Sequence, residues 1–225
     1  PGSKPLLTNW SSIQKVSKKE AKALGVKASR KGHVLTWDEQ IALFNELPPH
    51  LRQMAEFAIN TGCREKEVTG MKWEWFLTEP TSGIQYFVIP GEEHKNGQDR
   101  IVVLNEVALR VIEQCKGDHP VFVFTYNKGK PVKKINNSAY QSARKRASLK
   151  HPDIAKSHVH SWRHTFGTRL RNQALCPDEE RKELMGHKSR SMTEHYSVPE
   201  LRRMLEYCSK IKHPPSMQMA LVRNG

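Results

Sequence analysis

The basic side chains of this sequence constrain its fold, because they come from three regions that lie far apart in the chain. A late stretch contains the tetrad His160-Ser161-Trp162-Arg163, the pair Gly186-His187 and Tyr196. Arg64 follows the end of an expected helix much earlier, and Lys95 lies in an expected hairpin between the two. A fold that uses these groups together has to bring all three regions to one place.

The net charge of the chain points to a polyanionic partner. Its 225 residues suffice for one main domain, and 37 Lys and Arg against 23 Asp and Glu give a formal charge of +14. The isoelectric point of about 9.7 favours nucleic acid over a merely solvated basic surface. No apolar run approaches the roughly 20 residues that span a bilayer, so we expect no membrane partner.

The cysteines predict neither a zinc knuckle nor a disulfide framework, because they lie far apart and form no CxxC pair. Such usage fits a reducing cytosol. No secretory signal opens the chain, and Pro1-Gly2-Ser3 could be left over from cloning or mark an excised fragment. The four cysteines are Cys63, Cys115, Cys176 and Cys208.

Composition divides the chain into three parts. Residues 1–34 are rich in Lys and Arg and lack apolar periodicity, so we expect a basic N-terminal linker that follows phosphates or stays mobile. Residues 35–212 carry the patterns of a folded domain. Pro214-Pro215 sets off residues 213–225 as a C-terminal tail, and the segment from Leu201 onward could pack on a neighbouring protomer or on its own domain.

Local patterns predict a mainly helical α+β domain with a small antiparallel hairpin. Thr36 and Glu39 form a capping-box pattern that starts a helix, and Gly62 is placed to end the next one. Apolar β-branched stretches on both sides of an Asn96-Gly97 turn signal predict the hairpin. Helices are expected at 36–47, 50–61, 65–71, 105–115, 135–149, 161–172, 178–186, near 191–196 and after Pro199; strands at 84–90 and 100–104; a short strand or an extended piece at 120–125; and a loop at 127–131.

The two arginines suit a phosphodiester substrate. A planar guanidinium binds phosphate oxygens through two hydrogen bonds and stays charged at any working pH. Arg64 and Arg163 could therefore clamp one phosphate and neutralise the charge that builds in a pentacoordinate transition state. Because such a pair can replace a divalent ion, the sequence predicts no metal and no cofactor.

The remaining groups suit nucleophilic attack and proton transfer. The hydroxyl of Tyr196 is a weak nucleophile until it loses its proton, since the ordinary tyrosine pKa is about 10. His160 could take that proton because imidazole titrates near neutral pH, and Lys95 could protonate the leaving oxygen. His187 would donate a hydrogen bond to a phosphate oxygen.

Five pieces in this order resemble the catalytic domain of the tyrosine recombinases, the phage integrase family. They are Arg64 within TGCREKEVTGMKW, Lys95 before RIVVL, HSWRHTFGTRL, LMGHKS and the tyrosine of TEHY, and the resemblance spans residues 35 to about 205. The sequence departs from the family at Trp162, where a smaller apolar residue is usual, and at Ser197-Val198 after the tyrosine.

The resemblance implies a helical tyrosine-recombinase catalytic fold and a role for each residue. Tyr196 would attack the phosphate to give a 3′-phosphotyrosyl link and a free 5′-hydroxyl, and Glu67 would hold the site without reacting. The family's helical core-binding domain has no counterpart within 34 residues, so we expect weak, salt-sensitive DNA binding from this chain alone. The implied phosphate-activating set is Arg64, Lys95, His160, Arg163 and His187.

The function so implied is that of a site-specific recombinase or integrase of a mobile element. It would act on double-stranded DNA as a tetramer on paired sites, being a monomer when free, in the cytoplasm of a bacterial cell or phage-infected host. A type IB topoisomerase would share the site but relax supercoils as a monomer. A silent DNA-binding regulator would keep the fold without cleavage, and a nuclease would need a metal.

Several of these residues have plainer interpretations. His158, His160 and His164 could form a zinc set, but no cysteine or carboxylate lies at a helpful spacing and Arg163 would repel a cation. We expect His164 to be a structural hydrogen-bonding residue and His195 to point away from the phosphate. Arg169 and Arg171 should line the DNA side or the surface. The rivals of Lys95 are Lys130, Lys133 and Lys134, and the rivals of Tyr196 are Tyr140 and Tyr207, for which we expect packing roles.

Overall fold

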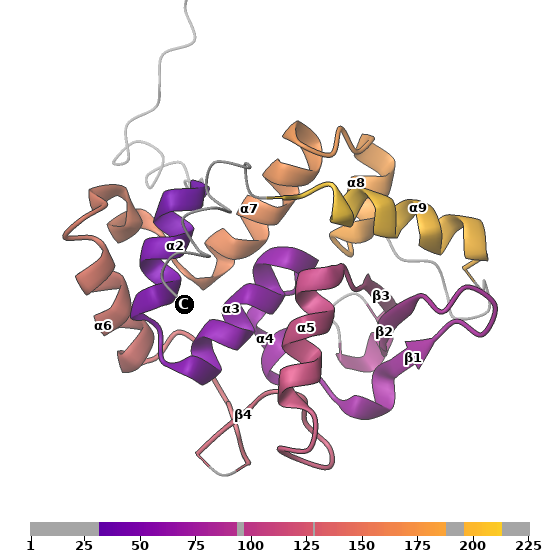
Figure 1. The fold of residues 1–225 in the computed structure, drawn as a ribbon, viewed down its shortest axis with the longest axis horizontal. Helices are drawn as coiled ribbons and strands as arrows, with labels where there is room; N and C mark the ends of the chain where they lie inside the picture. Colours follow the sequence, from indigo (N-terminus) through magenta and orange to yellow (C-terminus); the bar gives the residue numbers. More distant parts are fainter. Residues whose placement is uncertain (1–31, 94–96, 128, 188–195, 213–225) are drawn as a thin grey trace, which may run out of the picture. The chain divides into compact units, whose positions relative to one another are not determined.

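The computed structural model describes residues 32–93, 97–127, 129–187 and 196–212, which form a mainly helical domain with two small antiparallel sheets (Figure 1). The helices are α2 (Trp37–Glu46), α3 (Pro49–Thr61), α4 (Glu65–Thr69), α5 (Glu106–Cys115), α6 (Ser138–Ala147), α7 (Val159–Asn172), α8 (Asp178–Leu184) and α9 (Val198–Ser209). The strands are β1 (Phe76–Thr78), β2 (Gln85–Ile89), β3 (Arg100–Val103), β4 (Thr125–Tyr126) and β5 (Lys130–Pro131), and short 3-10 turns cover Trp73–Trp75, Gly91–Glu93 and Pro152–Lys156.

Capping residues set the ends of the first two helices. The Glu39 amide donates to Thr36 Oγ1 over 3.2 Å and the Thr36 amide donates to Glu39 Oε2 over 2.8 Å, which confirms the predicted capping box. Pro49 begins α3, where a missing amide leaves no bond unmade. Gly62 ends α3 with a φ of 66°, and a Cβ there would lie 2.5 Å from the Phe166 ring. Only glycine fits that turn without strain.

The larger hydrophobic cluster surrounds α3, which packs against both α5 and α7. Trp162 on α7 is fully buried in it, with its ring centroid 6.1 Å from that of Phe44 and 5.7 Å from that of Tyr140, both edge to face. The packing role expected for Tyr140 is confirmed. Through Trp162, α7 therefore packs against α2 and α6.

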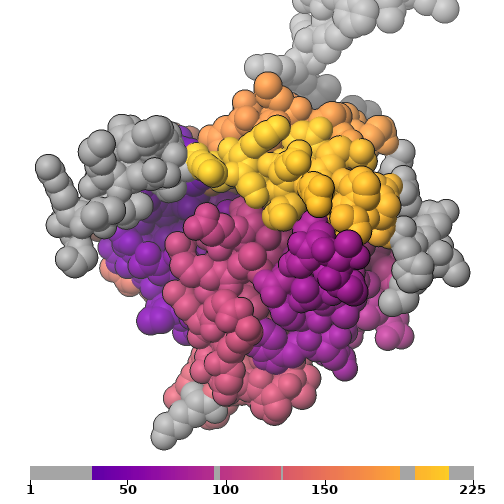
Figure 2. Space-filling model, turned by 45° about the vertical axis from the view of Figure 1, so that its right-hand side comes forward, coloured from indigo at the N-terminus to yellow at the C-terminus, as the bar shows by residue number. Residues whose placement is uncertain are grey.

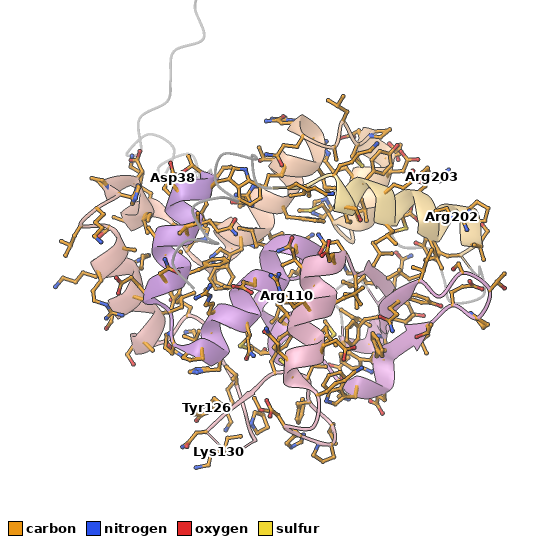
Figure 3. The ribbon with its side chains drawn as sticks, viewed as in Figure 1. Asp38, Arg110, Tyr126, Lys130, Arg202 and Arg203 are labelled. Atoms are coloured by element: carbon orange, nitrogen blue, oxygen red, sulfur yellow. The ribbon has the colours of Figure 1, made fainter. Side chains whose placement is uncertain are left out.

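A second hydrophobic cluster joins the C-terminal half of α7 to α8, α9 and strand β3. Phe166, Leu170 and Met204 are buried in it. In the space-filling view the yellow residues of α9 lie against the orange α7–α8 segment and the magenta strand region (Figure 2). An ion pair of 2.9 Å between Arg203 and Glu180 ties α9 to α8, and Arg203 stands on the outer side of its helix (Figure 3).

The predicted hairpin is confirmed as β2 and β3, where Phe87 pairs with Val102. A third strand, β1, pairs its Phe76 with the same Phe87 and was not predicted, because three half-exposed residues carry too little alternation. The segment 120–125, predicted as a short strand or an extended piece, is a strand only at Thr125, and Phe122 makes an isolated bridge to Lys72. The predicted loop at 127–131 contains the short strand β5. It pairs with β4, so that Tyr126 of β4 lies opposite Lys130 of β5 (Figure 3).

The other helices follow the predicted order with shifted ends. Helix α7 begins at Val159 rather than at 161, and α6 is shorter than the predicted 135–149. The predicted helix near 191–196 lies outside the described residues except for its last one. No helix among the described residues is long and apolar enough to cross a membrane. All four cysteines are free and buried.

Candidate active site

Arg64 is positioned by the turn between α3 and α4. It caps α4, where its amide donates to Glu67 Oε2 over 2.7 Å. Its guanidinium donates to Glu67 Oε1 over 2.6 Å and to the carbonyl of Gly186 over 3.4 Å. The side chain is 37% exposed, so Arg64 is more accessible to a ligand than buried Arg163.

Arg163 approaches the same place from α7 and is buried. Its guanidinium donates to the carbonyl of Gly62 over 2.5 Å and to the carbonyl of Met185. Burial, followed by the charges of Arg100 and Arg64, lowers its pKa to about 9. The side chain therefore remains a cation at neutral pH. Arg64 and Arg163 thus bind consecutive carbonyls of one turn, those of Met185 and Gly186.

Arg100 is a third arginine of this cluster, and the sequence did not reveal it. It is 2% exposed, pairs with Glu67, and donates to the carbonyls of Thr61 at 3.2 Å and Leu184 at 3.1 Å. Burial of Glu67 opposes its charge, but Arg100 and Arg64 outweigh that effect and lower the Glu67 pKa to about 2. One carboxylate therefore holds two guanidiniums in place. One sequence signal could have revealed Arg100: it is the first residue of the otherwise apolar strand β3.

His187 follows the turn that both arginines bind. Gly186 has a φ of 61°, and a Cβ there would lie 2.6 Å from Arg100 Cδ, so glycine is required. The His187 amide donates to the carbonyl of Lys182 over 2.8 Å. Partial burial, then the charges of Arg163 and Arg64, lowers the pKa of His187. These effects favour the neutral form of the imidazole.

His160 lies on the first turn of α7, one turn before Arg163. Its ring centroid lies 6.3 Å from that of His158 and 4.6 Å from that of His164. Partial burial, followed by the charges of His164 and Arg163, lowers its pKa to about 4. Because His160 also keeps an exposed surface, a neutral and accessible imidazole results, as a proton acceptor requires.

In the described part of the chain, the structure brings four of the six predicted residues near one another. Arg64, Arg163 and the His187 turn meet through the contacts above, and His160 lies near enough for their charges to act on it. Lys95 lies outside the described residues, and its role stays a prediction. Tyr196 precedes α9, half-buried against the second cluster, and its role also stays a prediction.

Arg169 does not line a DNA-facing surface, contrary to the sequence-based expectation. It is 6% exposed, its guanidinium lies 3.3 Å from the centroid of the Trp37 ring, and it donates to Gln40 Oε1 over 2.6 Å. The aromatic face and the amide oxygen compensate its burial, which sequence periodicity does not reveal. Arg171 is exposed, as expected. In the described part of the chain, no group of three His, Cys, Asp or Glu side chains could hold a metal ion.

Residues 33–201 match the model of the phage integrase family. The chain belongs to this family. The integrase of Salmonella phage P22 is 28% identical to it over 178 residues, which make up 75% of this chain and 44% of that protein. The chain therefore spans less than half the length of this curated relative.

Several solved structures share the fold of this chain. A lambda integrase dimer bound to a COC′ core site superposes with a TM-score of 0.55 at 20% identity, covering 80% of this chain and 70% of that one. The Tn1549 transposon integrase in complex with a circular intermediate DNA gives a TM-score of 0.56 at 19% identity, covering 83% and 68%. A lambda integrase tetramer bound to a Holliday junction gives 0.51 at 18% identity, covering 77% and 52%. The predicted tyrosine-recombinase catalytic fold is confirmed.

Proposed function

We propose that this domain cuts and rejoins double-stranded DNA through a covalent 3′-phosphotyrosine bond, as a site-specific recombinase or integrase of a mobile element. The observation that carries the proposal is the meeting of Arg64 and Arg163 at the turn that ends in His187. Two guanidiniums held at one turn form a site for a single phosphate. Family membership supports the same chemistry.

The reaction needs a nucleophile, an acid and a base in defined places. In our proposal Tyr196 Oη attacks the phosphorus, its proton passes to His160, and the bond to the 5′ oxygen breaks. Lys95 gives that oxygen a proton, so a 5′-hydroxyl leaves. Rejoining reverses each step, and no external energy is needed because the phosphotyrosine bond keeps that of the broken phosphodiester.

The arginine cluster supports transition-state stabilisation in this scheme. Arg163 is fixed by two carbonyls and Arg64 by Glu67, so neither has to reorganise as negative charge develops on the phosphate. His187 would add a hydrogen bond to a phosphate oxygen. A metal ion has no part in these steps.

A nicked suicide duplex tests the proposal. Duplexes tiled across the ends of the element that encodes the chain carry a nick beside each candidate position, so that cleavage releases a short 5′-hydroxyl strand and traps the adduct. Denaturing gels should show a protein–DNA adduct that resists EDTA. Tyr196→Phe should abolish it, while Tyr207→Phe, altered on the neighbouring helix α9, should keep it. No adduct with the unaltered chain, or an adduct with Tyr196→Phe, contradicts the proposal.

The same kind of experiment distinguishes the alternative functions from a recombinase. Relaxation of supercoiled plasmid by the monomer, without strand exchange between sites, would favour a type IB topoisomerase. Binding without adduct would favour a silent regulator, and loss of cleavage with EDTA a nuclease. We infer a tetramer on paired DNA sites, because lambda integrase, which shares the fold, binds a Holliday junction as a tetramer. We also place the activity in the cytoplasm of a bacterial cell or phage-infected host.

The division into a linker (1–34), a catalytic domain (35–212) and a tail (213–225) remains part of the proposal. Helix α2 begins at Trp37 and helix α9 ends at Ser209, both inside the proposed catalytic domain. Limited proteolysis tests the division: a protected fragment close to 35–212 supports it. Rapid cleavage within α2 or α9 argues against it.

A further inference from the structure

The segment that precedes α2 is attached to α7, the helix that carries His160. The Leu35 amide donates to Thr165 Oγ1 over 2.9 Å. Arg169 donates to the Leu35 carbonyl over 3.4 Å and lies on the Trp37 ring. These contacts bind the residues before α2 to two successive turns of α7. A shift of this segment would therefore also displace residues of α7.

Gly32 lies directly against the ring of His164. A Cβ at Gly32 would stand 2.3 Å from His164 Cδ2 and 2.9 Å from its Nε2, distances that real Cβ atoms do not reach. Any side chain at position 32 would force the imidazole to move. The glycine backbone thus forms one wall of the place in which the His164 ring sits.

His164 in turn contacts His160. The two are four residues apart on α7, so they share one face of the helix, and their ring planes meet at 85° with centroids 4.6 Å apart. His158 lies nearly parallel to His160, with planes 20° apart and centroids 6.3 Å apart. The His160 ring therefore has two imidazole neighbours, of which His164 is the nearer.

We propose that His164, backed by Gly32, is a positioning residue that fixes the His160 ring for proton transfer. The inference rests on the proposed function, because it assigns His160 the role of base. An imidazole misplaced by about 1 Å loses much of its effect on rate, so the ring needs support that its own exposed position does not provide. The charged or titratable groups acting on His160 are His158, His164, Arg163 and Arg64.

The pKa of His160 gives a readout that needs no DNA. The charge of His164 is one of the causes that lower the His160 pKa to about 4, after partial burial. Titration of ¹³C-labelled imidazoles by NMR, with His160→Asn to assign the signal, should show that His164→Ala raises the His160 pKa by about half a pH unit or more. Gly32→Ala should also move the His160 signal. The control Val34→Ala, an exposed neighbour in the same segment, should not.

Single-turnover cleavage of the suicide duplex gives the second readout. Gly32→Ala should slow adduct formation roughly tenfold. In a His164→Ala background the same change should have no further effect, because the ring that it displaces is gone. His164→Phe should restore most of the rate, since a ring again contacts His160. The acid limb of the pH–rate profile should move to higher pH in His164→Ala.

Two outcomes overturn the inference: additive effects of Gly32→Ala and His164→Ala on the rate, or a His160 titration that is unchanged in His164→Ala. Equal thermal midpoints among the variants exclude misfolding as the cause of a rate loss. If the unaltered chain forms no adduct, the proposed function fails. The NMR titration then decides alone whether His164 and Gly32 position the His160 ring.

Discussion

Removing the charge of Glu67 should destabilise the fold strongly, because two arginines depend on it. The carboxylate is 4% exposed and pairs with Arg64 at 2.6 Å and with buried Arg100. Glu67→Gln keeps the size of the side chain and some hydrogen-bonding ability but leaves Arg100 without a counter-charge. A buried charge that loses its partner is more harmful to stability than a missing hydrogen bond.

The pKa of Glu67 sets the size of the effect. It falls from the ordinary 4.5 to about 2 in the folded protein, which corresponds to about 3 kcal/mol of stabilisation by the ionised form. The sign follows from the lowered value: the contribution is complete above pH 4.5 and is lost as pH falls toward 2. Breaking a buried ion pair in other proteins removes about 3–5 kcal/mol, which agrees in magnitude.

Urea unfolding followed by tryptophan fluorescence measures the loss. Glu67→Gln should lower the free energy of unfolding by about 3 kcal/mol at pH 7, and by about 2.5 kcal/mol at pH 4. Arg100→Met should be destabilising as well, and the double variant should lose less than the sum by more than about 1 kcal/mol. Glu113→Gln, from an exposed pair with Lys116, is the control and should change little. Strict additivity, or a loss independent of pH, would refute the reasoning.

Three further predictions concern the core, the turn and the anion site. Trp162→Ala should lower the free energy of unfolding by about 3–5 kcal/mol in urea titrations, because its ring is fully buried against Phe44 and Tyr140. Gly186→Ala should slow adduct formation and lower the thermal midpoint, since φ is 61° and the new Cβ would meet Arg100; equal values for both proteins would argue against it. Sulfate should raise the thermal midpoint of the unaltered chain more than that of Arg163→Gln at equal ionic strength, by binding only the folded state.

Sequence patterns predicted the parts of the fold that local rules determine. The capping box at Thr36, the glycine stop at Gly62 and the β2–β3 hairpin each depend on a few neighbouring residues. Strand β1 and the β4–β5 pair were not predicted, because such short segments gain stability only by pairing with other strands. Burial of Arg169 was missed for the same reason: its partners Trp37 and Gln40 lie far away in sequence.

The sequence predicted those site residues that belong to a motif with a recognisable spacing. It did not predict residues whose importance comes from a contact with a distant part of the chain. Arg64, Arg163 and His187 were predicted from their motifs, and the structure brings their segments to one turn. Arg100 carries no motif; its importance comes from its pairing with Glu67, which lies on another element. Gly32 is similar, since an isolated glycine in a basic segment gives no sign that it faces His164.

The repulsion among the clustered arginines gives a reason why the site should bind a negatively charged transition state tightly. The carboxylate of Glu67 pairs with Arg64 and Arg100, while Arg163 has no carboxylate partner among its hydrogen bonds in the described residues. Burial and the charges of the other two arginines lower the pKa of Arg163 to about 9. Backbone carbonyls such as that of Gly62 offset only part of this repulsion, because they carry partial charges. Added negative charge on a phosphate relieves the rest. In the proposed reaction that charge is greatest at the pentacoordinate stage, so the cluster would lower the barrier to attack.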